Sequence, residues 1–133
     1  MKIYVVKPSN PDTNQFYKKL IANLSVFTDN PIVLWTESDL IGGDNITTKK
    51  AKHLTEADMI LFLVSSEIFG ILDEYKNKPH KKAIVVISTC VWTYSDLLNH
   101  CKLLHTANTT YTSATNKDSF VLDCVTNLMI MNE

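Results

Sequence analysis

Two uninterrupted runs of apolar residues constrain the fold of this 133-residue chain more than any other feature. The runs, residues 59–64 (MILFLV) and 83–87 (AIVVI), are bounded by polar residues and show no alternation of apolar and polar side chains. Such runs are typical of parallel strands that helices cover on both faces. Residues 3–6 and 32–35 form two further strand-like runs, and a weaker fifth lies at residues 109–112, where β-branched residues and a tyrosine cluster. The sequence therefore predicts five strands.

Helical patterns separate these strand-like runs. The clearest follows Asp12 and Thr13, two candidates for the N-cap, and places the apolar residues of 16–27 on one helix face. Four more helical patterns lie at residues 47–54, 66–76, 94–104 and 119–131. Strict alternation of buried strands and helices indicates a flavodoxin-like, three-layer α/β/α fold with a central five-stranded parallel sheet in the order 2-1-3-4-5. We expect residues 1–133 to form a single domain.

The composition argues against several classes of function. The chain has 13 basic and 14 acidic residues, which gives no general attraction to nucleic acid or to an anionic membrane surface. The longest apolar run is far too short to span a bilayer. Three cysteines, Cys90, Cys101 and Cys124, are odd in number and lack metal-ligand spacing. We therefore expect a soluble cytoplasmic protein with reduced thiols, no metal site, no nucleic-acid partner and no membrane partner.

Sequence motifs for the common catalytic and nucleotide-binding sites are missing. The chain has three glycines and contains neither a GxGxxG nor a GxxxxGK[ST] phosphate loop. It has no GxSxG nucleophile elbow, and its four histidines do not have metal-ligand spacing. These observations argue against a P-loop and a dinucleotide fingerprint of the usual type, and they give no basis for inferring a hydrolase triad.

The most informative segment follows the second strand-like run. It begins at Trp35, continues through an acidic stretch, and reaches the pair Gly42 and Gly43, which permits positive φ and a sharp reversal. Asp44 or Asn45 is then placed to cap the next helix. By itself this pattern is also that of an ordinary connection between a strand and a helix.

Four ordered matches make the chain resemble the TIR (Toll/interleukin-1 receptor-like) domains, especially those of bacteria. Residues 35–43 (WTESDLIGG) resemble the family's BB loop, and residues 54–65 (LTEADMILFLVS) resemble its third strand. Residues 83–87 with the following Cys90-Val91-Trp92 are similar to the fourth strand and its C-x-W motif, and residues 116–120 (NKDSF) to the entry of the last helix.

The resemblance implies a signalling or effector module, and we expect it to act in bacterial immune signalling. Such a module associates with itself or with another TIR-like domain, forms a homo-oligomer when active, and requires no cofactor. Apolar residues at the loop tip would insert between subunits, and acidic residues would fix their register. The residues implied in these contacts are Glu37, Ser38, Asp39, Leu40, Ile41, Gly42 and Gly43.

Other members of the family hydrolyse NAD+, which makes NAD+ glycohydrolase activity, regulated by assembly, the alternative function. These enzymes need a carboxylate beside the ribose, on the helix after the third strand. Glu74 is the best positional candidate and Glu67 the second, although this segment is shortened and lacks the family's cysteine. Trp35 and Ser65 would contribute to the nucleotide site. Glu74 on a solvated helix face and Trp35 as a buried strand terminus are the structural alternatives.

Two further classes remain open. The opening residues 1–8 (MKIYVVKP) are similar to those of nucleoside deoxyribosyltransferase-like proteins, whose later D-x-G-T and E-x-G-x-A signatures this chain lacks. A passive module that binds a small ligand is the other possibility, and it would be stabilised by a nucleotide without forming a product.

Overall fold

The five strands found among the described residues belong to one parallel sheet. The structure is a computed structural model and describes residues 1–27, 31–39 and 45–131. The strand order is β2-β1-β3-β4-β5, which confirms the predicted flavodoxin-like arrangement. The strands are β1 (Lys2–Val6), β2 (Val33–Trp35), β3 (Met59–Val64), β4 (Lys81–Val86) and β5 (Lys102–Leu103).

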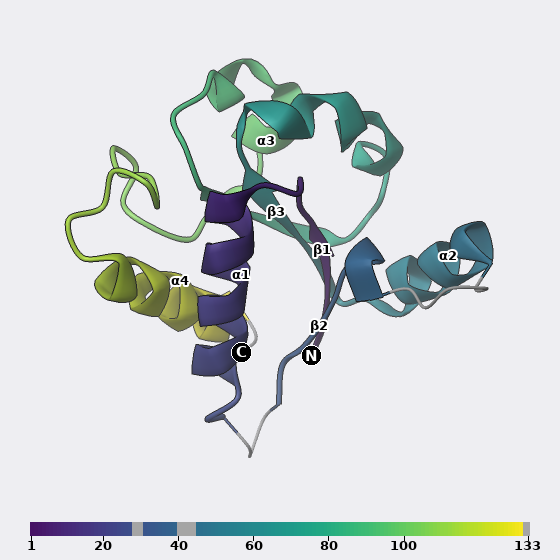
Figure 1. Cartoon of the computed structure of the whole chain (residues 1–133). Coiled ribbons are helices and arrows are strands. Elements are labelled where there is room, and N and C mark those ends of the chain that lie inside the picture. Colours follow the sequence, from purple (N-terminus) through teal and green to yellow (C-terminus); the bar gives the residue numbers. More distant parts are fainter. Residues whose placement is uncertain (28–30, 40–44, 132–133) are drawn as a thin grey trace.

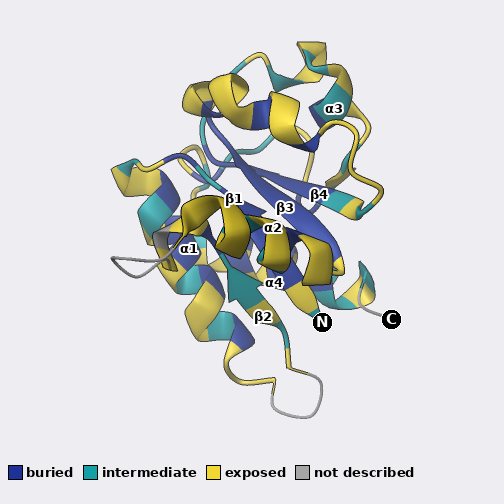
Figure 2. Ribbon diagram, turned by 90° about the vertical axis from the view of Figure 1, so that its right-hand side faces the viewer, coloured by how far each residue is buried: buried dark blue, intermediate teal, exposed yellow. Residues whose placement is uncertain are grey.

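The central strand β3 is the most deeply buried element. Each of its six residues is buried, because β1 pairs along one edge, β4 pairs along the other, and helices cover both faces. Figure 2 shows β1, β3 and β4 largely in the colour of buried residues, whereas the outer faces of the helices are exposed. The continuous apolar run that predicted this strand therefore reflects burial on two sides.

Helices form a layer on each side of the sheet. On one side lie α1 (Pro11–Leu24) and α4 (Lys117–Met131), which pack against each other. The other side is covered by α2 (Ile46–Glu56), the 3₁₀ helix η2 (Ser66–Tyr75) and the short α3 (Asp96–Asn99). Figure 1 shows α1 and α4 on one side of the strands and α2 on the other. Two 3₁₀ turns complete the elements, η1 (Glu37–Asp39) and η3 (Trp92–Tyr94).

The first helix starts earlier than the sequence pattern predicted. The side chain of Asn10 accepts a hydrogen bond from the backbone N–H of Thr13 at 2.9 Å and is the N-cap. Pro11 occupies the first helical position, where a missing N–H costs nothing. The assignment of Asp12 or Thr13 as the cap was therefore wrong.

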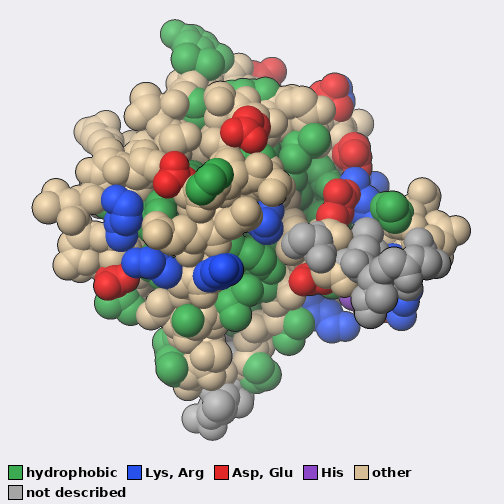
Figure 3. Space-filling view, viewed as in Figure 1, with side chains coloured by type: hydrophobic (Ala, Val, Ile, Leu, Met, Phe, Trp, Pro, Cys, Tyr) green, Lys and Arg blue, Asp and Glu red, His purple; other side chains and the backbone are tan. Residues whose placement is uncertain are grey.

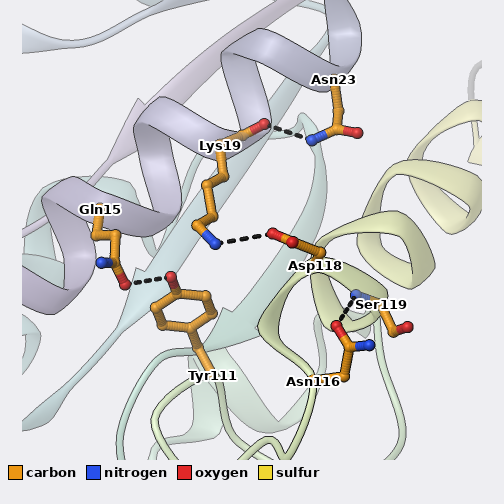
Figure 4. A network of polar contacts seen from close by, with 7 residues as sticks. All are labelled: Gln15, Lys19, Asn23, Tyr111, Asn116, Asp118 and Ser119. Carbon is orange, nitrogen blue, oxygen red and sulfur yellow. Dashed lines mark hydrogen bonds and ion pairs between the residues drawn. The ribbon is translucent and has the colours of Figure 1, made fainter.

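Polar contacts join α1 to α4 and to the loop that precedes α4. Lys19 pairs with Asp118 at 2.8 Å, and the hydroxyl of Tyr111 donates to the side chain of Gln15 (Figure 4). The Asn116 side chain accepts from the N–H of Ser119 at 3.0 Å, near the start of α4. These contacts lie at the edge of an apolar layer in which Phe16 and Phe120 meet edge to face.

The last third of the chain differs from its predicted elements. The helix predicted at residues 94–104 is wrong, because Ser95 caps a helix of only four residues and the chain then extends as β5. The fifth strand is β5 and not residues 109–112. Those residues still run beside the sheet, since the N–H groups of Tyr111 and Thr112 donate to the carbonyls of Val86 and Ile87. Their β-like composition reflects this pairing.

Within the described residues, no helix combines the length and apolar character that crossing a membrane requires. Lysine and carboxylate side chains are both present over the face shown in Figure 3, so neither sign of charge covers it alone.

Candidate functional site

The predicted catalytic residue Glu74 belongs to a cluster of three charged side chains. The ammonium of Lys50, from α2, donates to a carboxylate oxygen of Glu37 at 2.7 Å and also to the carboxylate of Glu74. The Lys50 side chain is 19% exposed, whereas those of Glu37 and Glu74 are more than half exposed. Lys50 therefore holds η1 and the end of η2 against α2.

Charge balance explains why this lysine stays protonated. Burial lowers the pKa of Lys50, but the hydrogen bonds to Glu37 and Glu74 more than offset it, so that the net pKa is raised. One ammonium thus faces two carboxylates, and the cluster (the Glu37–Lys50–Glu74 triad) carries a net negative charge.

Two buried tyrosines lie beneath the triad. The hydroxyls of Tyr4 and Tyr75 are 3.5 Å apart, and the ammonium of Lys50 lies 5.5 Å from the centre of the Tyr75 ring. Burial raises the pKa of both tyrosines, so both hydroxyls are neutral at physiological pH. They can donate or accept a hydrogen bond but do not serve as bases.

The open space beside Glu74 is small. The described residues form a hollow of about 80 Å³ there, lined by the triad, both tyrosines and the end of β1. Pockets that hold drug-sized ligands generally measure about 300–1,000 Å³. The hollow formed by these residues does not accommodate a dinucleotide.

The base of the predicted interaction loop is well defined. The carboxylate of Asp39 accepts a hydrogen bond from the backbone N–H of Thr36 at 3.0 Å, and the Thr36 carbonyl accepts from the Asp39 N–H at 2.9 Å. Glu37 and Asp39 thus begin the loop in a fixed 3₁₀ turn, which also contains Ser38. The remaining predicted residues, Leu40, Ile41, Gly42 and Gly43, lie outside the described residues.

After the loop, α2 begins with the cap expected from the sequence. The side chain of Asn45 accepts from the N–H of Thr48 at 3.1 Å. Asp44, the other candidate for this cap, lies outside the described residues.

Trp35 has structural partners on two sides. Its ring stacks on His53 with centroids 4.3 Å apart and an interplanar angle of 12°, and it lies 5.1 Å from the ring of Tyr4. Tyr4 in turn contacts Tyr75, which follows Glu74 in the chain. These contacts give Trp35 a packing role between β2 and α2.

Ser65 lies in a different group of polar residues from Glu74. At the carboxyl end of β3, its hydroxyl accepts from the side-chain amide of Asn10 at 3.4 Å. The same amide reaches the carboxylate of Glu67 at 3.5 Å. The structure therefore brings Ser65 together with Glu67, the second catalytic candidate, at the edge of the sheet where ligands bind in open α/β folds.

Sequence reasoning missed Lys50 and the tyrosine pair. Lys50 lies in a run of exposed helix residues, and nothing in its neighbours marks it as the cation between two distant carboxylates. The sequence does contain a signal for Tyr4, because its side chain is the one with a polar group in the apolar run of residues 3–6. Such a hydroxyl needs a partner when buried, and Tyr75 provides it.

Within the described parts of the chain, no group of three or more histidine, cysteine, aspartate or glutamate side chains is arranged to hold a metal ion.

Comparisons with protein-family models, curated proteins and solved structures found no match.

Proposed function

We propose that the protein is a TIR-like association module that acts by binding a second copy of itself, or another TIR-like domain, through the loop of residues 37–43. This function comes from the sequence resemblance. The loop follows the edge strand β2, and its described residues, 37–39, lie at the carboxyl end of that strand.

The observation that carries this proposal is the attachment of the loop base by the Glu37–Lys50–Glu74 triad. Lys50 bonds Glu37 to α2 and, through Glu74, to η2, while the Thr36–Asp39 hydrogen bonds close the first turn. A loop whose base is already ordered loses less conformational entropy on binding, which favours its use as a contact surface.

The contacts and surroundings of Glu74 also support association over catalysis. Its carboxylate is already occupied by Lys50, and the adjacent hollow is smaller than a nucleotide requires. In addition, a net charge of −1 opposes self-association only weakly.

The loop tip provides the direct experiment. We expect the wild-type mass to rise with protein concentration in light scattering, and the variant Leu40→Ala with Ile41→Ala to remain monomeric over the same range. The matched control removes two exposed apolar side chains elsewhere, Val91→Ala with Leu122→Ala, and should associate like wild type. Equal association of the loop variant and wild type would contradict the proposal.

A second variant tests the triad itself. Lys50→Met keeps most of the aliphatic stem but removes the charge that joins Glu37 to Glu74. We expect association to weaken several-fold, while stability changes by about 1 kcal/mol or less, because partly exposed ion pairs contribute little. Lys49→Met, one residue earlier and exposed, is the control. Unchanged association in Lys50→Met would show that the triad does not order the loop.

NAD+ hydrolysis is the alternative function, and the observation that favours it is the position of Glu74 beside a hollow with two tyrosine hydroxyls. In this reaction water adds across the glycosidic bond, giving nicotinamide, ADP-ribose and a proton. Glu74 would stabilise the positive charge that develops on the ribose.

A nicotinamide-release assay separates the two functions. The protein is incubated with NAD+ at concentrations where it is monomeric and where it is associated. Release that Glu74→Gln abolishes, and that Asp73→Asn leaves unchanged, would establish the enzyme; Asp73 is the adjacent carboxylate and is fully solvated. Absence of release in both states would leave association as the function.

A further inference from the structure

A second and much larger hollow lies on the opposite side of η2 from Glu74. It measures about 710 Å³, within the range of small-molecule pockets, and lies between η2, the start of β4 and α3. Successive residues divide the two hollows: Asp73 lines this one, whereas Glu74 lines the small one. The large hollow shares no lining residue with the small one and therefore lies apart from the triad.

Apolar groups make up part of its lining. Phe69 and Leu72 contribute from η2, and Leu97 and Cys101 from α3 and the turn that follows. The Cys101 thiol donates to the Leu97 carbonyl at 3.2 Å, and burial raises its pKa to about 11, so it is uncharged at physiological pH. These side chains form a surface against which a ring or a short hydrocarbon chain can pack.

A half-buried lysine provides a charge at the same place. Lys82, near the start of β4, donates to the backbone carbonyls of Lys78 and His80, the latter at 3.2 Å. An ammonium group has three N–H donors, so one remains after these two bonds. Among the described residues no carboxylate lies within ion-pair distance of Lys82.

The other ionisable groups of the hollow do not neutralise this charge. Asp73 lies 4.0 Å from Lys76, which gives it a cation of its own. Asp96 begins α3, where its carboxylate interacts favourably with the first turn of the helix. The backbone carbonyl of Asp96 is hydrogen-bonded to Nδ1 of His100 at 2.6 Å. His80 is bonded through Nε2 to the carbonyl of Leu54.

We propose that this hollow binds a small molecule with an anionic group, a carboxylate or a phosphate, on an apolar body. The anion meets the ammonium of Lys82, and the body packs on Phe69, Leu97 and Cys101. A partly desolvated cation without a counter-ion gains more from an anionic ligand than an exposed one does, because solvent screens it less. The site is independent of the proposed association function.

The experiment uses three probes that each contain a phenyl ring: phenyl phosphate, benzoate and benzylamine. Each is titrated into ¹⁵N-labelled protein and followed by NMR. We expect saturable shifts at the amides of Leu72, Leu97 and Cys101 with one or both anions, and none with the cation benzylamine. The two anions also show which acidic group is preferred.

Variants at two adjacent positions test the role of Lys82. We expect Lys82→Met to weaken anion binding about tenfold, the loss of one charged hydrogen bond, and Lys82→Arg to retain it. Lys81→Met removes the same charge from the next residue of β4, whose exposed side chain points to the other face, and should bind like wild type.

Three results would overturn the inference. They are shifts of equal size with benzylamine, unchanged anion affinity in a folded Lys82→Met protein, and absence of shifts at these amides with every probe at millimolar concentration. The spectrum of each variant shows whether it is folded, so a loss of binding is not confused with unfolding.

Discussion

The imidazole of His105 is the buried group whose hydrogen bonds best define its protonation state. The backbone N–H of Val86 donates to Nε2 at 2.9 Å, which requires an unprotonated nitrogen there. The proton therefore lies on Nδ1, which donates to the carbonyl of Thr106 at 3.0 Å. Burial lowers the pKa of His105, and the Thr106 bond and the Asp123 carboxylate offset this only in part. Protonation would break the bond with Val86 at the end of β4.

This arrangement makes stability depend on pH. The unfolded chain binds a proton near the ordinary histidine pKa of 6.5, and the folded chain binds it at lower pH. Between these values the unfolded state holds more protons, so the free energy of unfolding falls as pH falls below about 6.5, by at most about 1.4 kcal/mol per pH unit.

Urea unfolding at about pH 7.5 and at about pH 5.5 checks this dependence. We expect wild type to lose about 1 kcal/mol between the two conditions, and His105→Gln to lose clearly less. The exposed His100, replaced by Gln, is the control and should behave like wild type. An equal loss in His105→Gln and wild type would assign the pH dependence to other groups.

The contacts of single residues also show which features of the site the sequence could not predict. Glu37 and Glu74 were both named as candidates, from separate motifs, but nothing in their spacing indicated that they share one cation. Lys50 joins them because α2 packs beside the end of η2, a tertiary relation that periodicity does not encode. Ser65 and Trp35 were predicted to contribute to one nucleotide site with Glu74; in the structure Ser65 contacts Asn10, and Trp35 stacks on His53.

At the scale of elements, burial on two faces explains which predictions succeeded. The run at residues 59–64 gives the bounds of β3 without error, because a strand covered on both sides tolerates only apolar residues. The two-residue strand β5 has no such pattern, and Leu103 is only half-buried. The apolar spacing at residues 97–104 resembled a helix, although those side chains come from α3, a turn, β5 and the residue that follows β5.

The first helix carries a prediction of its own. Asn10 caps α1 and also bonds through its amide to Ser65 and Glu67, so it connects the helix start to the end of β3. We expect Asn10→Ala to lower the free energy of unfolding by about 1 kcal/mol, the usual effect of a lost N-cap. Urea denaturation measures this change.

A matched variant separates the cap from the amide contacts. Asn10→Ser keeps an oxygen that can accept from the Thr13 N–H but lacks the amide that reaches Ser65 and Glu67. We expect it to recover most of the stability lost in Asn10→Ala. A serine variant as unstable as the alanine variant would show that the amide contacts, and not the cap, stabilise this region.

For the molecule as a whole, the sheet separates two helical layers with different contents. The layer of α1 and α4 is continuous and apolar, with Phe16, Tyr111 and Phe120 packed together. The layer of α2, η2 and α3 holds both hollows and the Glu37–Lys50–Glu74 triad. The two candidate sites thus share one side of the sheet, and the opposite side provides the larger continuous core.

The positions of two thiols give this division a practical use. Cys101 is half-buried in the wall of the large hollow, whereas Cys124 is fully buried on the far side of the sheet. A thiol-specific alkylating reagent therefore meets one cysteine at the hollow and reaches the other only when α4 separates from the sheet. In a Cys90→Ser background, occupation of the hollow slows modification of Cys101 selectively, and opening of the whole domain accelerates modification of both. The ratio of the two alkylation rates thus reports occupancy, with an internal reference in every molecule.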